Sequence, residues 1–194
     1  MKKLIMVAVA AFMVTMGVNA QNMFIKPMVG ATMAKLTKVD DSKFKFGFVA
    51  GAEFGYKLSD PFAITAGALV SMQGTKIKDM GELTKRSASL TYLNIPILAN
   101  YEIVPGLAVK AGIQPGFLLS AKEKATVSGV KEEHSGTEGM KKVDFSIPLG
   151  LSYEISDFVI DARYNLGLTK TNKEGHDAIK NSVIMLTVGY KIPF

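Results

Sequence analysis

The sequence lacks cysteine altogether and holds only two histidines among its 194 residues. Without cysteine, the chain can form no disulfide bond and offers no cysteine for a lipid anchor. The two histidines, His134 and His176, lie in polar stretches and stand at no metal-ligand spacing from other candidate ligands. We therefore expect no metal site and no cofactor.

Long hydrophobic runs are also missing after the first 20 residues. Those residues begin with a short basic stretch, continue with an apolar run at 4–18 and end in small residues. This order is typical of a cleaved secretory signal peptide. A transmembrane anchor is the alternative, but the run is shorter than the roughly 20 residues that a membrane helix needs. We predict a signal peptide at 1–20 and one exported barrel domain at 21–194.

Charge of one sign forms no tract anywhere in the chain. Residues 21–194 contain 21 Lys and Arg against 17 Asp and Glu, and the surplus is spread along the sequence. Because nucleic-acid-binding domains present a clustered basic face, we expect no nucleic-acid partner.

What the sequence does contain is an alternation of apolar and polar residues, the pattern of a β-strand with one apolar face. In 143–154, every second residue from Val143 to Tyr153 is large and apolar. The pattern recurs, more weakly in some places, in eight segments of 11 to 14 residues: 24–34, 46–58, 62–73, 90–102, 107–120, 143–154, 158–168 and 184–194. Strands of globular proteins usually have about 5 or 6 residues, whereas a tilted membrane-crossing strand needs about 9 to 11. The lengths favour the membrane.

The connections between these segments alternate in length. Three are tight and rich in Pro, Gly, Asp and Ser, at 59–61, 104–106 and 156–157. Four are long and polar, at about 35–44, 74–89, 121–142 and 169–181. Short turns at one end and long extracellular loops at the other are typical of outer-membrane barrels. We predict an all-β fold, an eight-stranded antiparallel up-and-down transmembrane β-barrel.

Glycine indicates which face of the strands is enclosed. A soluble barrel of the lipocalin kind would show the same period with its apolar face inside. The strand glycines of this chain, among them Gly51, Gly150 and Gly189, all belong to the polar face. Glycine weakens an open strand but fits where side chains compete for space, as they do inside an eight-stranded barrel. We predict that the polar face lines the lumen and that the apolar face contacts outer-membrane lipid.

A four-residue motif recurs just before a tight turn or the end of the chain. Its copies are GYKL at 55–58, NYEI at 100–103, SYEI at 152–155 and GYKI at 189–192. Tyrosine suits a membrane boundary because its ring is apolar and its hydroxyl reaches water. We predict a periplasmic aromatic girdle that comprises Tyr56, Tyr101, Tyr153, Tyr190 and Phe194.

Charged residues on the polar face balance in sign. The basic ones are Lys26, Lys57, Lys110, Arg163 and Lys191, and the acidic ones are Glu53, Glu102, Asp144, Glu154 and Asp161. Because isolated buried charges are costly, we expect these side chains to form an ion-pair network in the lumen. Eight strands leave an interior that side chains can fill, so a closed lumen is favoured over a polar path for small solutes or protons.

Four stretches carry a resemblance to a known family: YLNIPIL at 92–98, KAGIQPGFLLSAK at 110–122, DARYNLGL at 161–168 and VGYKIPF at 188–194. Together they resemble the small outer-membrane β-barrel proteins often labelled porin family or PorT-like barrels. The resemblance implies an eight-stranded barrel whose C-terminal aromatic residue, here Phe194, is read by the barrel-assembly machinery. Pro193 before it departs from the family pattern. The resemblance implies no shared catalytic residue.

Prolines lie inside several predicted strands, at Pro27, Pro96, Pro115, Pro148 and Pro193. Proline cannot donate a hydrogen bond to a neighbouring strand, and a closed barrel has no free edge. We expect β-bulges at these positions. The alternative is that the prolines mark strand ends, but the alternation continues on both sides of Pro96 and Pro148.

The pattern favours a structural or interaction scaffold, whose four loops meet an extracellular ligand and whose ion-paired lumen is closed. A narrow passive pore for small solutes is the alternative. An enzyme at the extracellular rim is less favoured, because 132–134 and 176–177 are the only local candidates and supply no nucleophile, base and orienting group.

Overall fold

The structure, a computed structural model, describes residues 22–36, 42–78, 84–127, 130–136, 141–169 and 180–194. The predicted signal peptide at 1–20 lies outside the described residues. The strands are β1 (Met23–Leu36), β2 (Ser42–Ser59), β3 (Phe62–Lys78), β4 (Thr84–Asn94), β5 (Ile97–Val104), β6 (Leu107–Val127), β7 (Val130–Ser135), β8 (Val143–Ile155), β9 (Phe158–Gly167), β10 (Asn181–Tyr190) and β11 (Ile192–Pro193). Within the described ranges, no helix is long and apolar enough to cross a membrane.

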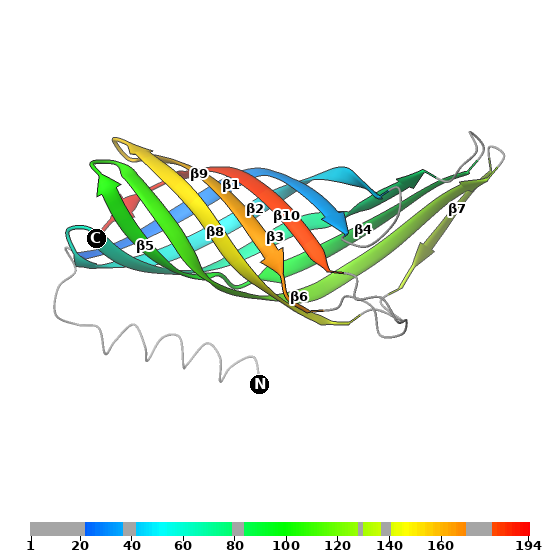
Figure 1. Cartoon of the computed structure of the whole chain (residues 1–194), viewed down its shortest axis with the longest axis horizontal. Helices are drawn as coiled ribbons and strands as arrows, with labels where there is room; N and C mark the ends of the chain where they lie inside the picture. Colours follow the sequence, from blue (N-terminus) through cyan, green and yellow to red (C-terminus); the bar gives the residue numbers. More distant parts are fainter. Residues whose placement is uncertain (1–21, 37–41, 79–83, 128–129, 137–140, 170–179) are drawn as a thin grey trace.

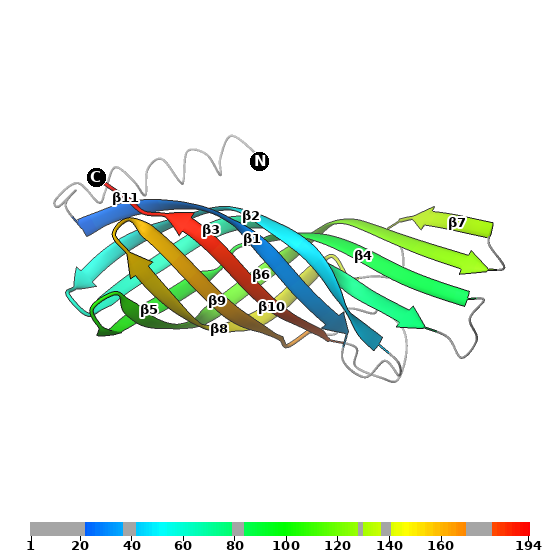
Figure 2. The same cartoon turned by 90° about the horizontal axis from the view of Figure 1, so that it is seen from above.

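The strands pair into a closed antiparallel barrel with eight strand positions. Figures 1 and 2 show the barrel from two sides. β4 and β5 follow one another between β3 and β6 and together take one strand position of the barrel. β11 continues β10 alongside β1, and β7 pairs with β6 alone. The barrel closes where β1 pairs with β10 over nine residues, from Met28 opposite Gly189 to Leu36 opposite Asn181. The predicted fold is confirmed.

The orientation of the two strand faces also follows the prediction. Along β9, exposed and buried residues alternate without exception: Phe158, Ile160 and Leu166 are exposed, whereas Asp161 and Arg163 are buried. Large apolar side chains therefore cover the outside of the barrel, and the polar face is enclosed. This distribution of apolar and polar side chains is the reverse of that in a soluble protein, and it fits a barrel surrounded by membrane lipid.

The three tight turns lie together at one end of the barrel, with the C-terminus (Figure 1). Each leaves two residues between its strands, as the bounds of β2 and β3, of β5 and β6, and of β8 and β9 require. Two turn residues have positive φ, Gly106 at 83° and Ser156 at 54°. Gly106 takes this conformation without steric penalty.

Parts of the segments predicted as loops are strand, which corrects that prediction. β3 and β4 pair as far as Lys78 opposite Lys85, and β6 folds back on β7 from Val127 opposite Val130. Figures 1 and 2 show these extensions beyond the far end of the barrel. The sequence pattern missed them because these stretches are polar at most positions, so their sequence shows no apolar period.

The expected bulges at the prolines are also wrong. Pro27 lies opposite Ala52, and Pro148 lies opposite Asn165, with the register unchanged on either side. Pro96 ends a strand, since it falls in the break between β4 and β5. In an antiparallel ladder each residue bonds to only one neighbouring strand, so a proline removes a single bond and leaves the register intact. Shifts in register occur elsewhere, for example between Thr91 and Tyr92.

Candidate functional site in the barrel lumen

An aromatic band lies at the end of the barrel that carries the tight turns. Tyr101 lies opposite Phe62, and Tyr190 lies opposite Phe158 with ring centroids 5.2 Å apart. Phe194 stacks beside Phe54 at 6.3 Å. Of the predicted girdle, Tyr101, Tyr153, Tyr190 and Phe194 are exposed and Tyr56 is half-buried. All five side chains belong to the outward face.

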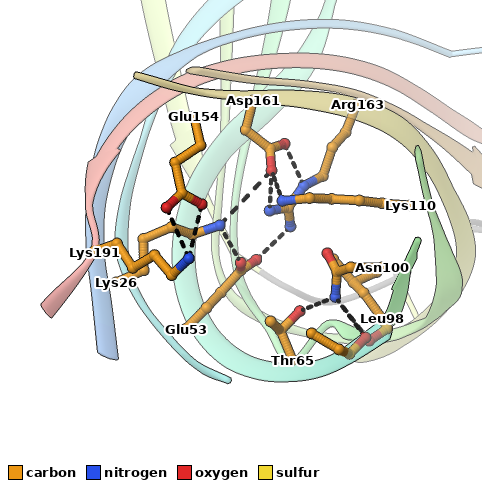
Figure 3. Close-up of polar contacts among 11 residues, drawn as sticks. Lys26, Glu53, Thr65, Leu98, Asn100, Lys110, Glu154, Asp161, Arg163 and Lys191 are labelled. Atoms are coloured by element: carbon orange, nitrogen blue, oxygen red, sulfur yellow. Dashed lines mark hydrogen bonds and ion pairs between the residues drawn. The ribbon is translucent and has the colours of Figure 1, made fainter. Parts of the chain in front are cut away.

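Five charged side chains meet in the lumen (Figure 3). Arg163 on β9 donates from Nε and Nη2 to the carboxylate of Asp161 at 2.6 and 2.8 Å, and its Nη1 lies 2.5 Å from Glu53 Oε1 on β2. Lys26 Nζ on β1 lies 2.9 Å from Glu53 Oε2 and 3.8 Å from Asp161 Oδ2. Lys110 Nζ on β6 donates to the same Asp161 oxygen. These five residues are called the charged cluster below.

The charged cluster is removed from water, since its side chains are 0–5% exposed. It brings three basic groups together with two carboxylates. Arg163 serves as the bridge because its planar guanidinium offers a two-pronged contact to one carboxylate and a further N–H to the other. Removing either carboxylate would leave buried cations without a partner, which is far more costly than removing an exposed charge.

Glycines make room for the long side chains of the charged cluster. A Cβ atom at Gly67 would lie 2.7 Å from Glu53 Cγ, and one at Gly150 would lie 2.9 Å from Arg163 Cγ. A Cβ at Gly189 would lie 2.9 Å from Lys26 Cγ. At these three positions, glycine leaves the space that the stem of a charged side chain occupies.

An apolar layer accompanies the cluster inside the lumen. Met28, Val49, Leu69 and Met185 pack together there and are 0–3% exposed. The sequence prediction of a polar lumen missed this layer. The layer could have been predicted from the alternation, since all four apolar residues occupy inward positions of their strands.

Not every residue of the predicted network joins the charged cluster. Lys191 and Glu154 form their own partly exposed pair at 2.8 Å (Figure 3). Lys57 is exposed and lies 3.5 Å from Asp60, and Glu102 is exposed and accepts a hydrogen bond from the Gly106 backbone. These positions are next to the tight turns, where the barrel opens to water, so the expectation of one continuous network is corrected to separate groups.

Asp144, the remaining member of the predicted network, lies apart from the cluster. Its carboxylate accepts hydrogen bonds from the Thr169 hydroxyl and from Asn181 Nδ2. It bonds to neutral groups alone among the described residues.

The lumen opens at the end with the tight turns into a cavity of about 690 Å³. Its walls include Lys26 and Lys110 from the charged cluster together with Glu102, Glu154 and Lys191. Lys26 and Lys110 are thus the members of the charged cluster that border this vestibule.

The two candidates for catalysis at the extracellular rim, 132–134 and 176–177, have no described side chains. His134 lies in β7 on a segment whose side chains are not described, and His176 and Asp177 lie outside the described residues. In the ranges that the structure covers, no three His, Cys, Asp or Glu side chains gather as metal ligands.

Comparisons with known proteins agree with this architecture. Residues 9–173 match the family described as the outer membrane protein beta-barrel domain. No curated protein is a match. Among solved structures, the chain is similar to Ail, the attachment invasion locus protein of Yersinia pestis, at 19% identity and a TM-score of 0.52, covering 89% of this chain and 99% of that one.

Two further solved structures are similar. One is Ail of Yersinia pestis in complex with the heparin analogue sucrose octasulfate, at 18% identity and a TM-score of 0.53 over 88% of this chain and 99% of that one. The other is Neisserial surface protein A, at 14% identity and a TM-score of 0.49 over 89% and 97%. At these identities, the two Ail structures show the fold alone.

One assignment follows from the closed eight-stranded barrel, its apolar exterior and the family match over most of the chain. The chain belongs to the family of outer membrane protein β-barrel domains, and its location is the outer membrane of a Gram-negative-type envelope.

Proposed function

We propose that the protein is a membrane-anchored interaction scaffold, with a lumen closed by the charged cluster and an extracellular end that binds an anionic partner. The proposal of a closed lumen rests on the burial of the charged cluster. Ion pairs between Lys26, Glu53, Lys110, Asp161 and Arg163 cross the lumen from four strands, and the apolar layer packs beside them. A passive pore would need a continuous wet path through both.

The proposal of an anionic partner rests on how charge is divided between the two ends. The segments at the end with the long connections, 35–45, 76–86, 122–142 and 170–180, hold 16 Lys and Arg against 10 Asp and Glu. The rest of 21–194 holds five against seven. The surplus that looks dispersed along the chain therefore belongs to one end, and a surface of that sign attracts anions.

Several lysines at this end are open to a partner. Lys122 on β6 is exposed, and so are Lys141 and Lys142, which precede β8. Ail in its complex with a heparin analogue has the same fold and supports a sulfated polyanion as the partner class. We further propose that the exposed Phe194 is recognised by the barrel-assembly machinery during insertion.

Retention of the purified barrel on immobilised heparin, eluted with a salt gradient in detergent, tests the anionic partner. We expect the double substitution Lys141→Glu and Lys142→Glu to lower the salt concentration at elution markedly, because each contact to a polyanion is salt-dependent. The matched control is Lys57→Glu, which reverses an exposed lysine at the opposite end. Equal loss in both variants, or no retention of the unaltered protein, would contradict the proposal.

A further inference from the structure

A second, much smaller cavity lies in the lumen away from the vestibule. It measures about 10 Å³ and is lined by Gln73, Asn94, Gln114, Gly116, Asp144, Ser146, Asn165, Asn181 and Val183. This chamber has room for one occupant the size of a water molecule or a small ion. Eight of its nine lining residues are polar or glycine, so it is not an apolar void.

The side chains around this chamber have polar atoms without partners. Gln114 Oε1, Asn181 Oδ1 and both polar atoms of Asn165 make no hydrogen bond within the described part of the chain. The three residues are 3%, 4% and 2% exposed, so bulk water does not reach them. Buried polar atoms in native proteins are nearly always paired with protein, water or an ion. Three of the four unpaired atoms are oxygens, which can accept a hydrogen bond or coordinate a cation, and the fourth is the amide nitrogen of Asn165.

The negative charge of Asp144 also favours a cation in the chamber. Asp144 is 9% exposed, and its two oxygens accept from Thr169 Oγ1 and from Asn181 Nδ2, the latter at 3.1 Å. No cation pairs with this carboxylate among the described residues, in contrast to Glu53 and Asp161 in the charged cluster. A buried carboxylate with neutral donors alone is left with an uncompensated negative charge.

We propose that the chamber binds one monovalent cation of about the size of sodium. The Asp144 carboxylate supplies the charge, and the side-chain oxygens of Gln114, Asn165 and Asn181 are the neutral ligands. Hard cations favour such carboxylate and amide oxygens. A single carboxylate suits one positive charge, whereas calcium sites usually gather several carboxylates. A water molecule would leave the charge of Asp144 uncompensated.

The cation would contact residues of four strands of the barrel, next to one of the extracellular connections. Gln114, Asp144, Asn165 and Asn181 belong to β6, β8, β9 and β10. Thr169 and Asn181, which both donate to Asp144, flank the segment that connects β9 to β10. Occupancy of the chamber therefore stabilises the end of the barrel from which this connection starts, whether or not the lumen conducts.

The stability of the protein in different salts tests this proposal. Thermal unfolding in nonionic detergent is followed by circular dichroism as NaCl replaces choline chloride at constant ionic strength, since choline is too large for the chamber. A ligand that binds only the folded state raises the midpoint with its concentration. We expect the midpoint to rise with sodium in the unaltered protein and to be independent of sodium in Asp144→Asn, which keeps the side-chain shape. Asp157→Asn, at an exposed tight turn, is the matched control and should keep the sodium response.

Equal midpoints in the two salts, or a sodium response that survives Asp144→Asn, would overturn the proposal. A high-resolution crystal structure grown in NaCl gives an independent readout if the Asn variant fails to fold. A cation would lie closer to Asp144 and two amide oxygens than the hydrogen-bond distance of about 2.7 Å. An empty chamber, or an occupant at water-like distances, would refute the assignment.

Discussion

At the scale of single residues, each strand position of this barrel faces one of two opposite environments. Leu149 on β8 is 48% exposed on the outer face, whereas Asp161 on β9 is fully buried inside. The same substitution therefore has different consequences at neighbouring positions, because lipid rejects charge and the lumen requires its charges to be paired.

Placing a charge on the outer face should impair insertion. Leu149→Arg, near the middle of β8, should destabilise the folded barrel by about 2–4 kcal/mol, and Val188→Arg on β10 should act similarly. Folding into lipid vesicles, read from heat-modifiable gel mobility, measures the effect, with Leu149→Ala as the uncharged control. Normal folding yield in both arginine variants would argue against a lipid-facing position.

Removing a charge from the cluster should also destabilise the barrel, for the opposite reason. In Asp161→Asn, Lys110 and Arg163 lose their common carboxylate, and three buried cations face Glu53 alone. We expect a loss of about 3–5 kcal/mol in the free energy of unfolding by urea. Asp60→Asn, which alters a fully exposed aspartate at a tight turn, should leave stability nearly unchanged. Similar midpoints for the two variants would mean that the cluster contributes little.

At the scale of elements, the strands have two parts with separate roles. The inner part of β6 pairs with β5, with β8 and with the last residues of β4 in the barrel wall, and the outer part pairs with the rest of β4 and with β7 beyond it. Only the inner part alternates between lipid and lumen, so only the inner part is needed to close the barrel.

The hairpin of β6 and β7 should therefore be dispensable for folding. Replacing residues 124–133 with Asn-Gly leaves Glu123 and His134, which lie opposite each other, joined by a favoured two-residue turn. We expect heat-modifiable mobility to be retained. Heparin retention should also persist, because the deleted segment holds two lysines and two glutamates and removes no net charge. Failure of this variant to fold would show that the hairpin supports the barrel.

At the scale of the whole molecule, we propose that a closed, charge-paired lumen is combined with a basic extracellular end. This division favours the scaffold over the pore, and single-channel recording in planar bilayers distinguishes them. We expect no steady openings from the unaltered protein, with an open-lumen porin as the positive control. Steady openings whose amplitude changes in Arg163→Ala would establish the pore and refute the closed lumen.

The sequence by itself determined the barrel wall. Segments 143–154 and 158–168 nearly coincide with β8 and β9, because each buried or lipid-facing position demands one class of side chain and the period of two is therefore visible. The tight turns and the aromatic band are equally local, since they depend on turn chemistry and on one amphipathic residue type. The outer-membrane location follows from the same pattern, whereas family membership rests on the stretches that resemble the family and on the match over residues 9–173.

Tertiary structure alone decided which of these residues meet. Glu53, Lys110, Asp161 and Arg163 come together with Lys26, while Lys57 and Asp144 do not, because depth in the lumen depends on strand stagger, which the period of two does not encode. The outer strands were not predicted for a related reason, since a stretch that is polar at most positions is recognised as a strand only through its pairing partner. Likewise, only the closed barrel gathers the scattered lysines at one end.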